Sequence, residues 1–233
     1  MLGWQMISDD GIDGLEQYQP RVPEPGPGEV VVDMKANSIN YRDYMIVSDP
    51  RARGIELPRT PNSDGGRVAS CFFQRWDDGP CSTDAMASAL GGALDGVLSR
   101  RVLLAANGVV KIPDSLSFAE ASTLPCAALT AWRAIVVEGG LKPGSTVLLL
   151  GTGGVSIFAL QFAQLMGARV IITSSSSEKL VRAREMGAWK TINYRDKPDW
   201  EKEVLKLTDG VGVDLVVEVG GAGTIARSVQ ATR

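Results

Sequence analysis

The segment TVLLLGTGGVSIFALQFAQLMGARVIITSSSSEK, residues 146–179, decides the fold class of this 233-residue chain. It begins with a continuous apolar run, 147–150, of the kind found in a parallel strand buried on both faces. A glycine-rich turn follows, and then a helix that Gly167 is expected to cap, before a second buried strand at 170–172. The residues expected on the buried face of the helix are Val155, Phe158, Phe162 and Leu165 or Met166.

The glycine turn has G-x-G-x-x-G spacing, with Ser156 in place of the last glycine. In such a turn Gly151 makes the tight bend and Gly153 lets the backbone approach a pyrophosphate, which then lies on the N–H groups at the helix N-terminus. The third position serves helix–strand packing, so a small serine is compatible with the motif. The turn therefore predicts a dinucleotide site. The alternative is a strand–helix turn that binds no ligand.

The end of the second predicted strand distinguishes between the two common dinucleotides. An NAD site usually has Asp or Glu there, which accepts hydrogen bonds from the ribose hydroxyls. This chain instead has the hydroxyl run Thr173–Ser177, with no acid before Glu178 and with Lys179 and Arg182 close behind. Hydroxyl and cationic donors suit a 2′-phosphate, so the sequence favours NADP(H) as cofactor. In a competing interpretation, Ser175 and Glu178 form only a capping box, and Lys179 lies on a solvated helix face.

The first half of the chain has the pattern of an irregular, mostly β domain. Up to about residue 120, short apolar runs alternate with turn residues, and Glu29–Lys35 and Leu98–Ala105 are predicted strands. We therefore assign residues 1–120 to one domain.

The second half has helical periodicity between buried strands. Ser117 and Glu120 have capping-box spacing, which predicts a helix running towards Glu138. Apolar runs and helical segments then alternate up to a fourth strand, Val213–Val219. This order predicts an α/β fold with a doubly wound parallel sheet in residues 121–233.

The composition excludes several classes of function. The chain contains no histidine, which removes Ser-His-Asp and Cys-His catalytic sites and the usual imidazole ligand of zinc. Cys71, Cys81 and Cys126 have no disulfide-framework spacing and fit a reducing compartment. The formal net charge is −3 without a basic stripe, so neither nucleic acid nor a membrane surface is an expected partner. Because we find no signal peptide and no membrane-spanning segment, we expect a cytoplasmic protein. The lack of histidine and of closely spaced cysteines leads us to expect no metal site.

Several short motifs occur in order along the chain. They are PGPGEV (25–30), SINYRD (38–43), LPC (124–126) with LTAW (129–132), LKPG (141–144), GTGGVS (151–156), EK (178–179), GA (187–188), INY (192–194) and VGG (219–221). Together they resemble the medium-chain dehydrogenase/reductase superfamily, in its zinc-independent, quinone-oxidoreductase-like branch. The resemblance runs from near residue 20 to the C-terminus. It implies a partial GroES-like catalytic domain, then an incomplete Rossmann domain, with the substrate bound between them.

The resemblance also implies roles for individual residues. The cofactor-binding residues it implies are Thr130 on the nicotinamide side; Gly151 in the tight turn; Gly153, Gly154 and Val155 at the pyrophosphate; Ser175, Lys179 and Tyr194 at the adenosine 2′-phosphate; and, in addition, Ser174 and Gly220. Asn40 and Tyr41 would line the substrate site near the nicotinamide. The zinc-dependent branch would have a Cys near Asn40 and a His near Asp64, and neither is present.

The sequence is shorter than the family pattern in two places. Between Asn62–Gly65 and the strand that begins at Arg67–Ala69, two strands and a turn are missing, roughly 15–20 residues at ordinary strand lengths. The sequence also ends at Arg233, after the fourth strand, whereas a full Rossmann sheet has six. We therefore expect Val213–Val219 to lie at the sheet edge and to favour self-association. A family-type homodimer through the last strands is not expected.

The function that these residues favour is hydride transfer from NADPH to an electron-poor carbon of a small conjugated carbonyl compound, such as a quinone or an enone. Without a metal, hydrogen-bond donors must stabilise the developing enolate. Tyr41 and Asn40 are the candidates, and a water could supply the final proton; Tyr41 could equally be an ordinary packed tyrosine. The alternative is a catalytically impaired or inactive shortened reductase that retains only nucleotide binding or partner association.

Overall fold

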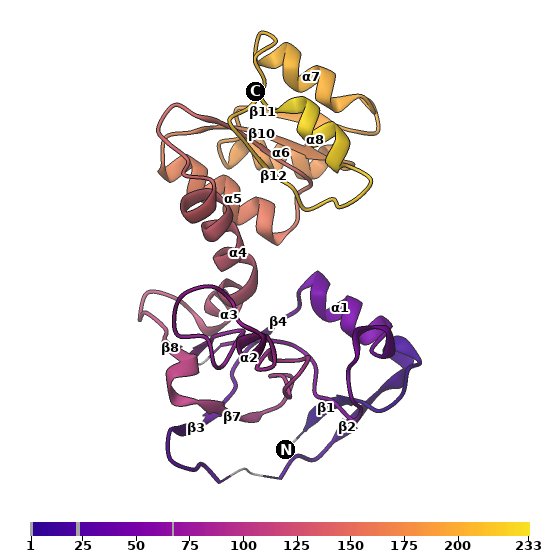
Figure 1. Cartoon of the computed structure of the whole chain (residues 1–233), viewed down its shortest axis with the longest axis vertical. Coiled ribbons are helices and arrows are strands. Elements are labelled where there is room, and N and C mark those ends of the chain that lie inside the picture. The colour runs from indigo at the N-terminus through magenta and orange to yellow at the C-terminus, as the bar shows by residue number, and fades with distance from the viewer. Residues whose placement is uncertain (1, 22–23, 67) are drawn as a thin grey trace. The chain divides into compact units, whose positions relative to one another are not determined.

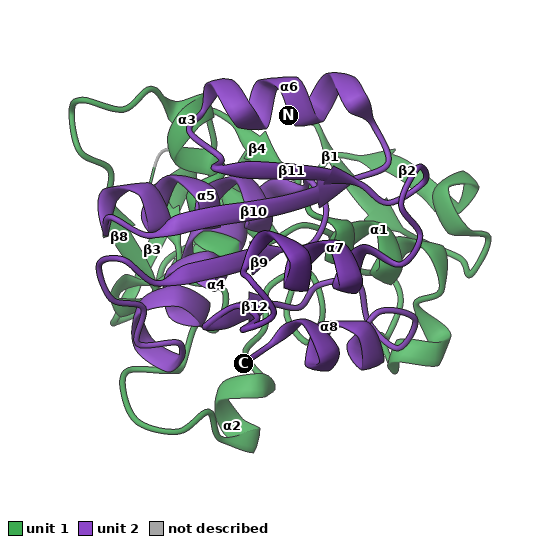
Figure 2. Ribbon diagram, turned by 90° about the horizontal axis from the view of Figure 1, so that it is seen from above, with its two compact units in different colours: residues 1–126 green, residues 127–233 purple. Residues whose placement is uncertain are grey.

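The computed structural model describes residues 2–21, 24–66 and 68–233. The chain forms two compact units, Met1–Cys126 and Ala127–Arg233, which Figure 2 distinguishes by colour. Each unit buries hydrophobic clusters of its own. No helix in the described parts of the chain is long and apolar enough to cross a membrane.

A four-stranded parallel sheet forms the centre of unit 2. Its strands are β9 (Thr146–Leu149), β10 (Arg169–Ser174), β11 (Lys190–Asn193) and β12 (Leu215–Val217). They lie in the order β11-β10-β9-β12, and every pair is parallel. The chain therefore winds from β9 in both directions, which confirms the predicted α/β fold of the Rossmann type. In such a sheet, ligands bind beside the carboxyl ends of the strands at the point where the winding reverses.

Helices cover both faces of this sheet (Figure 2). They are α4 (Leu129–Trp132), α5 (Gly154–Leu165), α6 (Ser177–Glu185), α7 (Trp200–Leu207) and α8 (Ile225–Ala231). Side chains of a strand alternate between the faces, so Val147 and Leu149 of β9 pack in one cluster with Leu160 of α5. Leu148 of the same strand packs in the other cluster with Val204 of α7. Burial on both faces explains the continuous apolar run of β9.

The buried face of α5 differs from the prediction. Its fully buried residues are Ser156, Ala159, Leu160 and Ala163. The predicted Val155, Phe158, Phe162 and Met166 lie partly buried at the margin of the same cluster, whereas Leu165, the alternative to Met166, is 84% exposed. Small residues let the helix approach the strands closely, while the larger side chains fill the margin. There the Phe162 ring meets the edge of Trp132 at a centroid distance of 5.4 Å.

The helix predicted from Ser117 onwards is interrupted. The capping box is present, because the Glu120 amide donates to Ser117 Oγ at 3.2 Å and the Ser117 amide donates to Glu120 Oε2 at 2.9 Å. It opens only the short helix α3 (Phe118–Ser122), after which π-helical turns begin, the first at 124–128. Pro125 accounts for this break, since proline has no N–H to continue the α-helical hydrogen bonds.

Unit 1 consists of short antiparallel strand pairs (Figure 1). The pairs are β1 (Gly3–Met6) with β2 (Leu15–Tyr18), β3 (Glu29–Asp33) with β7 (Arg101–Ala105), β4 (Asn37–Ser38) with β5 (Asp64–Gly65), and β6 (Val68–Ser70) with β8 (Val109–Lys111). Its helices are α1 (Tyr41–Ser48), α2 (Thr83–Met86) and α3, with 3-10 turns at Gly11–Gly14, Arg51–Arg53 and Ala106–Gly108. Arg67, at the start of the predicted strand, lies outside the described residues. Between β6 and β7 the chain forms only α2 and isolated bridges.

The strand β12 is shorter than the predicted Val213–Val219, and it lies at the edge of the described sheet as expected. The residues just before β12 form hydrogen bonds with the C-terminal segment of the chain. The Val213 amide donates to the carbonyl of Ala231 at 2.9 Å, and the Arg233 amide donates to the carbonyl of Val213 at 3.2 Å. The edge is therefore partly paired before the strand begins.

Candidate functional site

The turn between β9 and α5 presents accessible backbone. Gly151 has a φ of +73°, which favours glycine, and Gly153 is the N-cap of α5. No heavy atom lies within 4 Å of the position that a Cβ of Gly153 would take, whereas a Cβ on Gly154 would stand 3.2 Å from the Cβ of Ala127. The first N–H groups of a helix have no intrahelical acceptor. Open backbone beside such groups fits the pyrophosphate of a dinucleotide.

Side chains fix the shape of this turn. Ser156 is 1% exposed, and its hydroxyl donates to the carbonyl of Leu150 at 2.7 Å. The serine therefore fits the third motif position and bonds the first turn of α5 to the end of β9. The Gly151 amide donates to Oγ1 of Thr173 at 3.1 Å, so the end of β10 supports the same turn.

The predicted residues at the end of β10 lie next to one another. Ser174 is only 4% exposed, and its Oγ lies 3.0 Å from Oγ1 of Thr152 and accepts a hydrogen bond from the Ser176 amide at 3.2 Å. The Tyr194 amide donates to the Ser174 carbonyl at 3.1 Å. Ser174 is thus largely committed to holding the glycine turn, and a ligand would meet its more exposed neighbours.

The cap of α6 is one residue later than predicted. Ser176 is the N-cap, and its Oγ accepts a hydrogen bond from the Lys179 amide at 3.3 Å. The predicted capping box of Ser175 and Glu178 is therefore wrong, because the bond from the Ser176 amide to Ser174 delays the first helical turn. Ser175 is half-buried and lies outside the cap, and Lys179 is exposed in the first turn of α6. A solvated Lys179 agrees with either interpretation of that residue.

The loop after β12 lies across the winding reversal from the glycine turn, because Val217 pairs in register with Leu149. The predicted cofactor residue Gly220 is exposed here, but its amide donates to Glu218 Oε1 at 2.7 Å. A ligand would therefore meet the carbonyl or Cα of Gly220 and not its N–H. Thr130 is exposed on α4 in the same unit.

The two predicted catalytic residues begin α1 in unit 1. Asn40 is the N-cap, and its backbone amide donates to Asp43 Oδ2 at 2.8 Å. The side-chain nitrogen of Asn40 is buried and makes no hydrogen bond of normal geometry among the described residues, although the Asn40 side chain lies close enough to Asp64 to lower the pKa of that carboxyl group. Tyr41 is 75% exposed, with its ring 6.0 Å from that of Tyr44. Such exposure does not fit the alternative of a packed core tyrosine.

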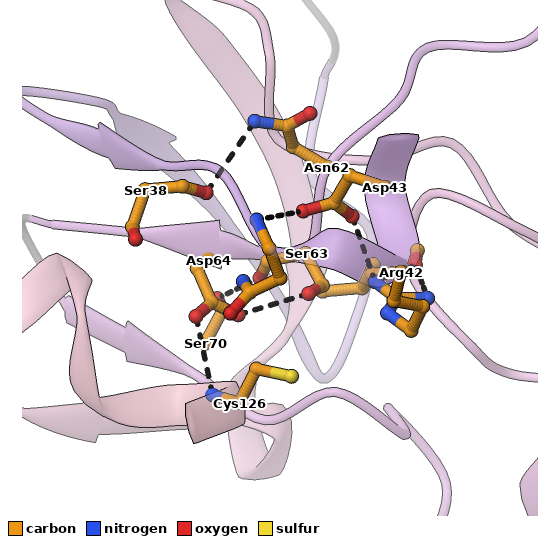
Figure 3. A network of polar contacts seen from close by, with 10 residues as sticks. Ser38, Arg42, Asp43, Asn62, Ser63, Asp64, Ser70 and Cys126 are labelled. Carbon is orange, nitrogen blue, oxygen red and sulfur yellow. Dashed lines mark hydrogen bonds and ion pairs between the residues drawn. The ribbon is translucent and has the colours of Figure 1, made fainter. Parts of the chain in front are cut away.

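Beside them lies a buried polar network that the sequence analysis missed (Figure 3). Asp43 and Asp64 are 2% and 0% exposed. Arg42 Nη2 lies 3.2 Å from Asp43 Oδ1, while Asp64 accepts hydrogen bonds from Ser63 Oγ at 2.9 Å and from the Cys126 amide at 3.1 Å. Burial raises the pKa of both carboxyl groups, although these donors oppose it. The motifs SINYRD and NSDG contained both aspartates, but nothing in their spacing indicated that they meet.

Unit 1 has a cavity of about 650 Å³ that is lined neither by the predicted catalytic residues nor by the two buried aspartates. Tyr18, Gln74 and Leu104 are among the residues that line it, and Asn40 and Tyr41 are not. The cavity therefore gives no support to a substrate site at Asn40 and Tyr41.

Comparison with known proteins identifies the family. Residues 154–233 match the family model described as zinc-binding dehydrogenase. A zinc-type alcohol dehydrogenase-like protein of Schizosaccharomyces pombe is 44% identical over 246 aligned positions, which cover 96% of this chain and 71% of that protein. The chain belongs to the medium-chain dehydrogenase/reductase superfamily. Because the alignment is longer than the 233 residues of the chain, this superfamily member is shortened internally relative to that protein.

Solved structures of the superfamily match nearly the whole chain. A protein assigned as an alcohol dehydrogenase of Sinorhizobium meliloti 1021 is 39% identical with a TM-score of 0.90, covering 99% of this chain and 73% of its own. An NAD-dependent alcohol dehydrogenase is 34% identical with a TM-score of 0.87, covering 100% and 74%. The quinone oxidoreductase of Thermus thermophilus, solved with NADPH, is 26% identical with a TM-score of 0.78, covering 100% and 70%. The superfamily gives this chain a general, nicotinamide-dependent oxidoreductase function.

The family model is named after zinc, but the residues of this superfamily member do not fit a zinc ion. The chain has no histidine. Its cysteines are not paired in disulfides, and no group of three or more Cys, Asp or Glu side chains in the described ranges could hold a metal ion. Burial raises the pKa of the Cys126 thiol, as do Asp64 and Asp43, which opposes the thiolate that zinc needs.

Proposed function

We propose that this chain is an NADPH-dependent reductase of small conjugated carbonyl compounds, such as quinones or enones. The preference for NADPH over NADH is supported by the residues at the end of β10. There Ser175 and Lys179 follow Ser174, whose carbonyl accepts a hydrogen bond from the amide of the exposed Tyr194 just after the neighbouring strand β11. The run 173–177 contains no carboxylate to repel a 2′-phosphate.

The cofactor would be held by residues of unit 2. The open backbone at Gly153 and the first N–H groups of α5 would bind the pyrophosphate. Lys179 would supply the charge that distinguishes a 2′-phosphate from a hydroxyl, and Thr130 and Gly220 would lie on the nicotinamide side. NADPH, when bound, supplies the hydride.

The substrate would be handled by residues of unit 1. Tyr41 has an exposed hydroxyl-bearing ring, and Asn40 has a buried amide nitrogen that makes no hydrogen bond of normal geometry among the described residues. Hydrogen bonds from such donors would stabilise the negative charge that develops on the carbonyl oxygen when hydride adds to the electron-poor carbon. A water would then protonate the enolate, so that the double bond or quinone gains one hydride and one proton.

Purified protein should be mixed with NADPH or NADH and a panel of quinones and enones, and the loss of nicotinamide absorbance followed. We expect the protein to oxidise NADPH in preference to NADH. The rate of NADPH oxidation should be much lower in the Tyr41→Phe variant. No consumption of either cofactor with any compound of the panel would contradict the proposed activity.

A second candidate function is nucleotide binding without turnover, because the chain is shortened internally compared with the S. pombe relative. Calorimetry with NADPH separates the two functions. Binding without oxidation of NADPH by any quinone or enone would favour this second candidate.

A further inference from the structure

A single carboxylate organises the loop that follows β12. Oε1 of Glu218 accepts hydrogen bonds from the amides of Gly220 at 2.7 Å and Gly221 at 3.0 Å, and from the hydroxyl of Thr224 at 2.7 Å. Its other oxygen, Oε2, accepts a hydrogen bond from the hydroxyl of Ser228 on α8. Glu218 thus joins the end of a strand, a glycine turn and a helix.

The turn held by Glu218 has a shape that needs both of its glycines. A Cβ on Gly220 would stand 2.4 Å from Oγ1 of Thr224, and Gly221 has a φ of +81°, which disfavours other residues. Glycine segments have high conformational freedom when nothing restrains them. The carboxylate supplies the restraint, because it receives both glycine amides and the threonine hydroxyl on one oxygen.

This loop stands where the cofactor site needs a second wall. The sheet winding reverses between β9 and β12, and Val217 is paired with Leu149. The loops that leave these two strands are the glycine turn at 151–156 and the loop at 218–224. Ligands of doubly wound sheets bind between the loops at such a reversal.

We propose that Glu218 is a positioning residue that shapes the second wall of the cofactor site by fixing the loop 219–224 before the nicotinamide end of the cofactor binds. The inference rests on the proposed cofactor site. Glu218 would not touch the cofactor, because its two oxygens already receive four donors of the chain. The adenosine end, near Lys179, would be independent of it.

A charged carboxylate suits this role. Burial alone would raise the pKa of Glu218, but the hydrogen bonds from Ser228, Thr224 and the two glycine amides lower it, so the group remains an acceptor for all four donors at neutral pH. A glutamine at this position has one acceptor oxygen, and its NH₂ group would face donors.

The test compares the whole cofactor with its adenosine half. The binding of NADP⁺ and of 2′,5′-ADP to the full chain is measured by calorimetry for the parent, for Glu218→Gln and for the control Glu203→Gln, whose carboxylate pairs with Lys197 on the surface of unit 2. We expect Glu218→Gln to raise the Kd of NADP⁺ about tenfold, as the loss of charge-assisted hydrogen bonds implies. The Kd of 2′,5′-ADP should stay unchanged, and the control should match the parent for both ligands.

Two further variants and one further measurement keep the inference testable if Glu218→Gln does not fold. Thr224→Val and Ser228→Ala each remove one donor and should shift the Kd of NADP⁺ in the same direction by a smaller factor. Hydrogen exchange at Gly220 and Gly221 should become faster in the variants that weaken NADP⁺.

Three results would overturn the inference. The first is an unchanged Kd of NADP⁺ in Glu218→Gln. If Glu218→Gln does not fold, the corresponding result is an unchanged Kd of NADP⁺ in both Thr224→Val and Ser228→Ala. The second is an equal loss for NADP⁺ and 2′,5′-ADP, which would indicate general damage to the unit. The third is a parent chain that binds neither ligand; this outcome differs from the others because it rejects the proposed cofactor site itself.

Discussion

The backbone amide of Gly151 donates a hydrogen bond to the side-chain oxygen of Thr173 at 3.1 Å. This bond connects the tight turn after β9 with the end of β10, and Thr173 is only 2% exposed. The amide of Gly151 is therefore used within the fold. Binding of a pyrophosphate falls to the N–H groups from Gly153 onwards, whose positions depend on this support.

Replacing Thr173 by valine keeps the side-chain shape and removes the acceptor. The part-buried amide of Gly151 would lose its partner, which costs about 1–3 kcal/mol of unfolding free energy. We expect urea unfolding to show this loss and calorimetry to show weaker cofactor binding. Thr191→Val is the control, since it removes a surface contact with Arg184 and leaves the glycine turn intact. Unchanged stability in Thr173→Val would show that the bond does not support the turn.

Gly153→Val should remove cofactor binding at a moderate cost in stability, because valine is a poorer N-cap than glycine. Gly153 has extended backbone with a φ of −80°, and nothing lies within 4 Å of the Cβ position, so the fold accepts the new side chain. The added methyl groups would occupy the space where the backbone must approach the pyrophosphate. Calorimetry with NADP⁺ and thermal unfolding measure the two effects separately.

Gly151→Ala provides the contrast to Gly153→Val. Its φ of +73° is unfavourable for alanine and costs about 1–2 kcal/mol. This variant should lose stability, although a Cβ there meets no neighbour. If Gly153→Val bound NADP⁺ as well as the parent does, the pyrophosphate assignment would be wrong.

The sequence was sufficient to predict the sheet because local signals and global packing agree there. The apolar run 147–150 is buried on both faces, and the serine at position 156 packs as its size suggested. The cap of α6 was misplaced because four consecutive serines give equivalent local signals. The tertiary structure selects among them, because the Ser176 amide donates to Ser174 and the Lys179 amide donates to Ser176.

The polar networks could not be predicted, because they join residues that are distant in the chain or lack a motif. Asp64 accepts from the amide of Cys126, 62 residues away. Glu218 looks like an ordinary polar residue at the end of a strand until Ser228 on α8 is brought next to it. Such contacts depend on the tertiary fold, which spacing along the chain does not encode.

Lys179→Ala tests the cofactor preference. If Lys179 contacts the 2′-phosphate, the variant should weaken NADPH binding by about 1–3 kcal/mol, as for a charge-assisted contact, and barely change NADH binding. Lys206→Ala is the control, because Lys206 is exposed on α7. Equal losses for NADPH and NADH would reject the assignment and favour a helix-surface role for Lys179.

Chelators should leave the protein unchanged. The chain has no histidine, and its described residues offer no ligand cluster for a metal, so no structural zinc should contribute to folding. We expect the same thermal unfolding midpoint with and without EDTA, and no stoichiometric zinc by elemental analysis. A midpoint lowered by EDTA would contradict the zinc-independent assignment.

Asp64→Asn should change how stability depends on pH. Burial raises the pKa of Asp64 above its ordinary value of 3.8, so the folded chain binds more protons than the unfolded chain. Stability is then lost as pH rises from about 4 through the raised pKa. Asparagine stays neutral, so the stability of the variant relative to the parent should increase as the pH rises from about 4 through the raised pKa of Asp64.

Asp33→Asn is the matched control for this pH series, because its trend should have the opposite sign. A hydrogen bond from Lys35 is the main cause that lowers the pKa of the half-buried Asp33, so the parent carboxylate favours folding above the unfolded pKa and this contribution is lost in acid. Urea unfolding of the parent and both variants across the pH series measures the two slopes. The constant cost of placing an amide at position 64 shifts the whole Asp64→Asn curve and leaves its slope unaffected. If the difference between Asp64→Asn and the parent were independent of pH, the Asp64 carboxyl group would titrate alike in the folded and unfolded chains, and the inferred effect of its burial would be wrong.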